Sequence, residues 1–179
     1  MRYVALLRGI NVGGKAMLSM AQLREALEKA GYQNVSTYIN SGNVLIETTE
    51  TNTRDLARSI EAIIENAFHL PVGVRVISQI QYEKILAEAP AWWGKDPTWK
   101  HNFIVLIEPY DMNDVISTIG ELKPDIEAMQ SSDGVLYQSI SLKGFGRSTG
   151  GKLSAKPVYK QMTIRNYTTA QKLLALLSK

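Results

Sequence analysis

The sequence predicts an α+β fold made of two similar ferredoxin-like subdomains, packed as one body. Strand and helix patterns follow the order β-α-β-β-α-β over residues 1–78, which is the ferredoxin-like unit. Part of this order recurs over residues 102–179, where MQSSDGVLY resembles the earlier INSGNVLI. Residues 79–101 form a connecting segment with a short helix and a tryptophan cluster. The second subdomain carries a basic, glycine-rich insertion.

Each element of the first half has a local signal. Apolar residues at helical spacing follow two capping residues, Ser19 and Asn52, and the two helices end near Gly31 and Pro71. Ser41–Gly42 is expected to form a hairpin turn. The strands that we expect in this half are residues 3–7, 35–39, 44–46 and 72–77.

The second half begins with a predicted strand at 102–107 and a helix capped by Asp111. A hairpin around Asp133–Gly134 follows, and then the insertion at 143–161. We expect the last helix to begin at a capping box formed by Thr168 and Gln171. The tryptophans of the connecting segment are expected to anchor it across the domain junction, with base stacking as the alternative: Trp92, Trp93 and Trp99.

Composition excludes several classes of site. The chain has 179 residues, of which 45% are hydrophobic and 21% charged, as in ordinary globular proteins. It has no cysteine, which rules out disulfides, thiolate zinc sites and a cysteine nucleophile. The sequence contains no signal-peptide pattern and no long apolar run, so we expect a cytoplasmic protein without a membrane partner.

Charge is distributed unevenly along the chain. All 17 acids lie within residues 25–133, so residues 1–24 and 134–179 carry cations alone. A positive field favours anionic partners such as nucleic acid, nucleotides or phosphorylated metabolites. The alternative is a solvated surface whose cations pair with acids elsewhere in the fold.

The segment LLRGINVGGKAML, residues 6–18, comes close to a phosphate-binding loop. Gly9, Gly14 and Lys15 fit the pattern G-x-x-x-x-G-K-[ST], but Ala16 lacks the hydroxyl that would bind Mg²⁺. The predicted helix also begins late, and a hairpin follows where a parallel crossover is required. A nucleotide-hydrolysing loop is therefore disfavoured, which leaves an anion site or a structural loop whose glycines take positive φ.

Three segments are candidate anion sites, of which the loop at residues 6–18 is the first. The second is KGFGRSTGGKLSAK, residues 143–156, where glycines accompany basic side chains, as in phosphate clamps and in flexible loops. The third is TIRNYTT, residues 163–169, at the start of the last helix, where the alternative role is capping alone. The candidate anion-binding residues are Arg8, Asn11, Gly13, Gly14, Lys15, Arg147, Lys152, Arg165 and Asn166.

Catalytic signals are few. The two histidines, His69 and His101, have no metal-ligand partner at useful spacing, and no nucleophile elbow or paired-carboxylate signature is present. We therefore expect no metal and no cofactor, and name no catalytic residue.

Four motifs together resemble one bacterial family. LLRGINVGGK, TYINSGNVLI, GFGRS and TIRNY are similar to the motifs of the family called domain of unknown function 1697, and they extend from residue 6 to residue 167. The resemblance implies a cytoplasmic α+β protein with two similar subdomains, and it implies no activity. The residues that match the motifs are Arg8, Gly9, Asn11, Gly13, Gly14, Lys15, Ser41, Gly42, Asn43, Arg147, Arg165 and Asn166, while Tyr167 replaces an expected Trp.

The function that we expect is binding of a phosphate-bearing partner, foremost nucleic acid. An enzyme that acts on a small phosphorylated substrate or nucleotide is the first alternative, and a protein-interaction module without a ligand is the second. Because fields from separate cations add, we expect one shared cleft lined by Arg8, Lys15, Arg147 and Arg165. The sequence does not indicate the oligomeric state.

Overall fold

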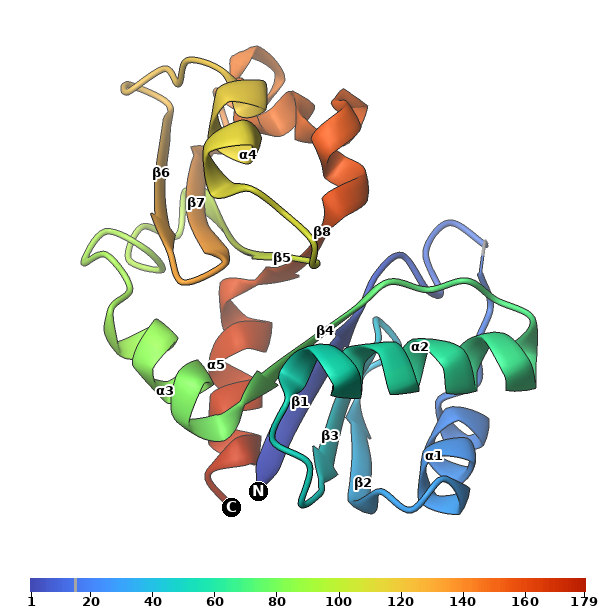
Figure 1. Ribbon diagram of the computed structural model, residues 1–179. Coiled ribbons are helices and arrows are strands. Elements are labelled where there is room, and N and C mark those ends of the chain that lie inside the picture. The colour runs from blue at the N-terminus through green and yellow to red at the C-terminus, as the bar shows by residue number, and fades with distance from the viewer. Residues whose placement is uncertain (15) are drawn as a thin grey trace. The chain divides into compact units, whose positions relative to one another are not determined.

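The computed structural model describes residues 1–14 and 16–179 (Figure 1). The chain forms two compact units, the first being Met1–Glu83 with Lys172–Lys179 and the second Lys84–Gln171. These bounds differ from the predicted ones, because the end of the chain groups with the first unit. Each unit holds one four-stranded antiparallel sheet with helices, which confirms the predicted pair of similar α+β subdomains.

The first unit has the ferredoxin-like strand order β2-β3-β1-β4. Its elements are β1 (Arg2–Leu7), α1 (Met20–Lys29), β2 (Gln33–Tyr38), β3 (Asn43–Glu47), α2 (Thr53–Phe68), β4 (Val74–Ser78) and the start of α3 (Gln79–Ala87). The predicted caps are confirmed. Ser19 accepts a hydrogen bond from the amide of Gln22, and Asn52 accepts from those of Arg54 and Asp55.

Alternation along β1 places its side chains on two faces of the sheet. The face toward α1 and α2 carries Tyr3, Ala5 and Leu7, which join the buried apolar residues of both helices in one core. The connection between β2 and β3 covers residues 39–42. Ile39, which we expected to end a strand, lies in this turn with φ of 51°.

The second unit repeats the same order as β6-β7-β5-β8. Its elements are the rest of α3, β5 (Trp99–Leu106), α4 (Met112–Ile119), β6 (Glu127–Ser132), β7 (Val135–Ser141), the 3₁₀ helices η1 (Phe145–Arg147), η2 (Gly150–Ala155) and η3 (Pro157–Gln161), β8 (Met162–Asn166) and α5 (Tyr167–Leu177), which continues into the first unit. The predicted insertion at 143–161 therefore lies between β7 and β8, where the first unit has α2.

The start of the last helix was predicted wrongly. Residues 162–166 form the fourth strand, in which Ile164 pairs with Ile104 of β5. The helix is capped by Asn166, whose Oδ1 accepts a 2.7 Å hydrogen bond from the amide of Thr169. Asn is as good a capping residue as Thr, and here it begins the helix two residues before the predicted cap at Thr168.

Trp93 fixes the connecting segment to the second sheet. Its side chain is 4% exposed, and its indole Nε1 donates to the carbonyl of Asn102 at 3.0 Å. Its ring lies 4.8 Å from that of Tyr167 and 5.3 Å from that of Tyr137, between ring centroids. All these partners belong to the second unit, so Trp93 is part of that unit's core and presents no stacking surface to a base.

Candidate functional site

The first candidate site is the loop that follows β1. Gly9, Gly13 and Gly14 have φ of 66°, 60° and 72°, which is the left-handed conformation that glycine adopts without strain. All three are exposed, and a Cβ atom at any of them would meet nothing within 4 Å. The glycines therefore serve the backbone turn, and they leave the main chain open to a ligand. Lys15 lies outside the described residues.

Asn11 holds this loop together. Its Nδ2 donates to the carbonyls of Leu18 and Asn40, both at 2.9 Å, and its Oδ1 accepts from the amide of Leu18 at 2.7 Å. Both amide protons are thus used within the protein. The structure gives Asn11 a scaffolding role that links the loop after β1 to the turn between β2 and β3.

Arg8 continues the inner strand β1 by one residue, near a second arginine on the neighbouring strand β4. Its amide donates to the carbonyl of Gly73 at 2.9 Å, which continues the ladder between β1 and β4. By strand alternation Arg8 shares a face with Leu6, whose partner across the ladder is Arg75. Arg75 is 7% exposed. Sequence reasoning missed it, although an arginine inside the apolar strand VGVRVI was the available signal.

The second candidate site is the 3₁₀ segment between β7 and β8. Arg147 and Lys152, both predicted, are exposed on η1 and η2. The carbonyl of Arg147 accepts a 2.6 Å hydrogen bond from Lys123 Nζ. Arg147 also lines an open hollow of about 620 Å³ with residues 121–126, which include Glu121 and Asp125.

The buried side chain of Glu127 holds this segment in place by hydrogen bonds. Its carboxylate is buried and accepts three main-chain hydrogen bonds, from Lys123 and Thr149 at 2.9 Å and from Gly150 at 2.7 Å. Burial by itself raises the pKa of Glu127, but the hydrogen bonds from Gly150, Thr149 and Lys123 outweigh it and hold the pKa below its ordinary value. The carboxylate is therefore an ionised anchor for the loop.

Glycine is required at position 150 because a side chain there would collide with its neighbours. A Cβ atom there would lie 2.4 Å from Gln138 Nε2 and 3.2 Å from Glu127 Oε2. Within the segment, Ser148 Oγ donates to the carbonyl of Phe145 at 2.7 Å and accepts from the amide of Gly151 at 2.9 Å. The segment that reads as a flexible loop in sequence is an ordered scaffold.

The third candidate site is changed by the presence of β8. Arg165 lies inside this strand, paired with Phe103, and is 6% exposed. Its Nη1 donates to Thr163 Oγ1 at 2.7 Å and to the carbonyl of Ile164 at 3.0 Å. Asn166 caps α5 with its side-chain oxygen. Arg165 therefore directly precedes the cap of α5, but it is buried in β8 and donates to main-chain and side-chain groups of that strand.

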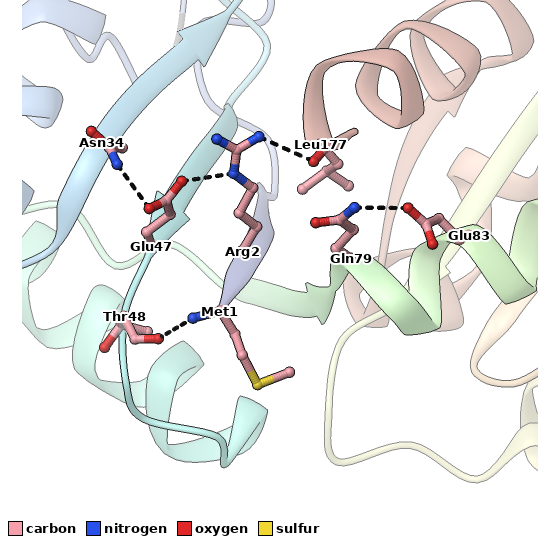
Figure 2. A network of polar contacts seen from close by, with 8 residues as sticks. All are labelled: Met1, Arg2, Asn34, Glu47, Thr48, Gln79, Glu83 and Leu177. Carbon is pink, nitrogen blue, oxygen red and sulfur yellow. Dashed lines mark hydrogen bonds and ion pairs between the residues drawn. The ribbon is translucent and has the colours of Figure 1, made fainter. Parts of the chain in front are cut away.

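Four ion pairs of described residues use cations from outside the basic segment. These pairs are Arg2–Glu47, Arg24–Glu28, Arg58–Asp55 and Lys84–Glu88. The first is the shortest, at 2.7 Å, and Glu47 also accepts from Asn34 (Figure 2). In the described part of the chain, no ion pair takes a cation from residues 143–160.

One histidine has a hydroxyl partner. His101 Nδ1 lies 2.6 Å from Ser139 Oγ, and its Nε2 lies 2.8 Å from the carbonyl of Asp96. Since a carbonyl only accepts, Nε2 donates to it, and in a neutral ring Nδ1 then accepts from the serine. Ser139 is 2% exposed, so this pair joins the 88–98 segment to the sheet and offers no accessible nucleophile.

The described residues contain no group of three or more His, Asp or Glu side chains that could hold a metal ion. Among the helices of the described chain, none has the length and apolar character needed to cross a membrane. Arg8 belongs to the first unit and Arg147 and Arg165 to the second, and a cleft shared by them stays a prediction.

Comparison with known proteins identifies the family. Among solved structures, the conserved bacterial protein SP0830 from Streptococcus pneumoniae is similar to this chain, with a TM-score of 0.88 and 30% sequence identity over 98% of each chain. No curated protein matches. A family model for proteins of unknown function matches residues 1–137. This range includes the loop after β1 and the turns of the hairpins β2–β3 and β6–β7. The chain therefore belongs to the family described as Protein of unknown function (DUF1697).

Proposed function

We propose that this protein binds phosphate-bearing polyanions, foremost nucleic acid, through its glycine-rich basic loops. The observation that carries the proposal is the basic 3₁₀ segment, whose exposed Arg147 and Lys152 stand on a scaffold fixed by buried Glu127.

Order in the segment favours binding. Ligands lose affinity when they must immobilise a flexible loop, because the lost conformational entropy opposes association. Here the amides of Thr149 and Gly150 are already fixed by Glu127, and Ser148 closes the turn between η1 and η2. The backbone that carries Arg147 and Lys152 is therefore held in place before any ligand arrives.

Charge favours a polyanion. Residues 134–179 carry cations and no acid. The exposed cations that stand on the segment are Lys143, Arg147, Lys152 and Lys160. Phosphates bound by such side chains release condensed counterions, which makes a repeating phosphate backbone a strong ligand at moderate salt.

The first loop supports the same class of ligand. Its glycines present an exposed main chain, and residues 1–24 contain no acid. Main-chain amides in consecutive turns of this kind form concave sites for anions. The loop after β1 and the 3₁₀ segment are thus two anion-binding elements, one in each unit.

A small phosphorylated molecule is the second candidate ligand. The hollow beside Arg147, at about 620 Å³, falls within the range of small-molecule sites, roughly 300–1,000 Å³. The two acids that line it, Glu121 and Asp125, weaken its attraction for phosphate, which is why the polyanion ranks first.

Two further expectations belong to this proposal. The identical strand order of the two sheets supports an internal repeat, in which η1–η3 take the place of the helix α2. A cytoplasmic location fits a nucleic-acid ligand and a chain without cysteine.

The test is a binding titration by fluorescence anisotropy with labelled single- and double-stranded DNA and RNA oligomers, repeated at several salt concentrations. The double variant R147A/K152A should bind less tightly, and its slope of log affinity against log salt should be shallower by about 0.7–0.9 for each lost phosphate contact.

Arg58→Ala is the matched control, because Arg58 is an exposed cation on α2 and should leave the slope unchanged. Saturable binding of nucleotides with weak salt dependence would favour the small ligand. Wild-type protein that binds neither would contradict the proposal.

A further inference from the structure

Three exposed aliphatic residues lie in the loop after β1 and in the turn that is hydrogen-bonded to it. Val12 is 63% exposed, Met17 73% and Ile39 50%. We call these three residues the aliphatic tip. Single exposed apolar residues are common on protein surfaces, but these three are brought together by one hydrogen-bonding centre.

That centre is Asn11. Val12 follows it directly in the chain. Met17 precedes Leu18, which exchanges two hydrogen bonds with the side chain of Asn11. Ile39 precedes Asn40, whose carbonyl accepts from the same side chain at 2.9 Å. The hydrogen bonds of Asn11 therefore hold together the backbone that carries the three residues of the tip.

Ile39 is held in an unfavourable backbone conformation. Its φ of 51° is left-handed, which a β-branched residue rarely adopts. Hydrogen bonds on both sides impose it: Asn43 Nδ2 donates to the carbonyl of Tyr38 at 2.9 Å, and Leu7 donates to Gly42 at 2.8 Å. The backbone strain at this half-exposed apolar residue opposes folding, which points to a use at this surface.

The surroundings of the tip are polar and basic. The described residues of the loop, 8–14 and 16–18, include Arg8 and no acid, and the turn at 39–42 has no charge. Gly13 and Gly14 expose their main chain between Val12 and Met17. A matching ligand must offer negative charge, hydrogen-bond acceptors and apolar faces within a few ångströms of one another.

Nucleic acid with unpaired bases meets all three requirements. Phosphate oxygens accept from main-chain amides and attract cations, while bases present flat faces that aliphatic side chains contact or separate. An anionic lipid layer fits less well, because the polar main chain of Gly13 and Gly14 would enter hydrocarbon beside Val12 and Met17.

We propose that the aliphatic tip packs against unpaired bases of a bound nucleic acid, while the glycine loop binds the adjacent phosphates. This inference rests on the proposed function and adds a second mode of contact to it. Contacts of the tip are apolar, so they contribute affinity without releasing counterions.

The test uses the full chain with the triple variant V12S/M17S/I39N. Asn tolerates left-handed φ, so the variant keeps the turn and removes the aliphatic surface. We expect its affinity for a single-stranded 12-nucleotide oligomer to fall at least about fivefold, with the salt slope unchanged. A 2-aminopurine in the oligomer should brighten on binding wild-type protein and less on binding the variant.

Ile80→Ser is the control, because Ile80 is also exposed and aliphatic, at 69%, and lies on α3 away from the loop. A triple variant with wild-type affinity overturns this inference while R147A/K152A still tests the proposed function by its salt slope. Wild-type protein that binds no oligomer overturns both. A third outcome is that wild-type protein binds phosphatidylglycerol vesicles but no oligomer, while the variant does not bind the vesicles. That result would assign the tip to lipid and overturn the nucleic-acid inference.

Discussion

The carboxylate of Glu127 accepts a 2.7 Å hydrogen bond from the main-chain amide of Gly150, and the same group binds the amides of Lys123 and Thr149. One buried side chain thereby joins the start of β6 to the basic 3₁₀ segment. The segment replaces a regular helix at this place in the fold, so its order depends on such side-chain contacts more than on a helical ladder.

We predict that Glu127→Gln destabilises the second unit. Glutamine keeps a carbonyl oxygen for the amides of Lys123 and Thr149, but its NH₂ group would face the amide of Gly150, and the side chain carries no charge. The free energy of unfolding should fall by about 2–4 kcal/mol, since hydrogen bonds to a charged acceptor are the strong ones. Denaturant unfolding measures this, with the exposed Glu25→Gln as control. Equal stability of the two variants would show that the carboxylate does not anchor the loop.

Stability should also depend on Glu127 through pH. The pKa of Glu127 is lowered in the folded protein from its ordinary 4.5. The carboxylate therefore contributes stability that is fully present above that ordinary value and is lost as the pH falls through the folded value. Unfolding free energies measured from pH 7 to pH 3 should decline more steeply for wild-type protein than for Glu127→Gln. Parallel curves would contradict the assignment.

Local patterns sufficed for most of the fold. Caps at Ser19, Asn52 and Asp111 and the alternation of the strands predict their elements from neighbouring residues alone. The sequence pattern did not predict strand β8, because MTIRN passes into α5 with no turn residue between them. Its identity as a strand comes from pairing with β5, which lies about 60 residues earlier in the chain.

The sites were harder to predict for the same reason. Arg8, Gly13 and Arg147 could be chosen by residue type and spacing, because glycines and cations are local signals. The partners of Asn11 and Glu127 lie up to 29 and 23 residues away, and sequence spacing does not reveal them. A buried glutamate inside IEAMQSS reads as an ordinary polar residue of a hairpin until the 3₁₀ segment covers it.

We predict unequal effects from two glycine substitutions. Gly13 and Gly42 both have left-handed φ, at 60° and 78°. A Cβ at Gly13 meets open space, so Gly13→Ala should cost only the backbone strain, about 1–2 kcal/mol. At Gly42 the Cβ would lie 2.7 Å from the Cβ of Leu7, so Gly42→Ala should cost about 1–3 kcal/mol more. Chemical denaturation of both variants checks this, and similar losses would disprove the contact.

The last prediction concerns the neighbours Trp92 and Trp93. Trp93 is buried among Phe103, Tyr137 and Tyr167, whereas Trp92 is only half-buried. Trp93→Ala removes a large buried ring and its indole hydrogen bond to Asn102, so it should lower the free energy of unfolding by about 3–5 kcal/mol.

Trp92→Ala is the matched control and should lower the free energy of unfolding by much less than Trp93→Ala does. Thermal unfolding followed by circular dichroism compares the two, and Trp93→Phe gives a folded variant for binding assays. Because Trp93 lies inside the core, Trp93→Phe should bind oligomers as wild-type protein does for each folded molecule. A loss of oligomer binding in Trp93→Phe without a loss of stability would instead make the ring part of a ligand surface and reverse this assignment.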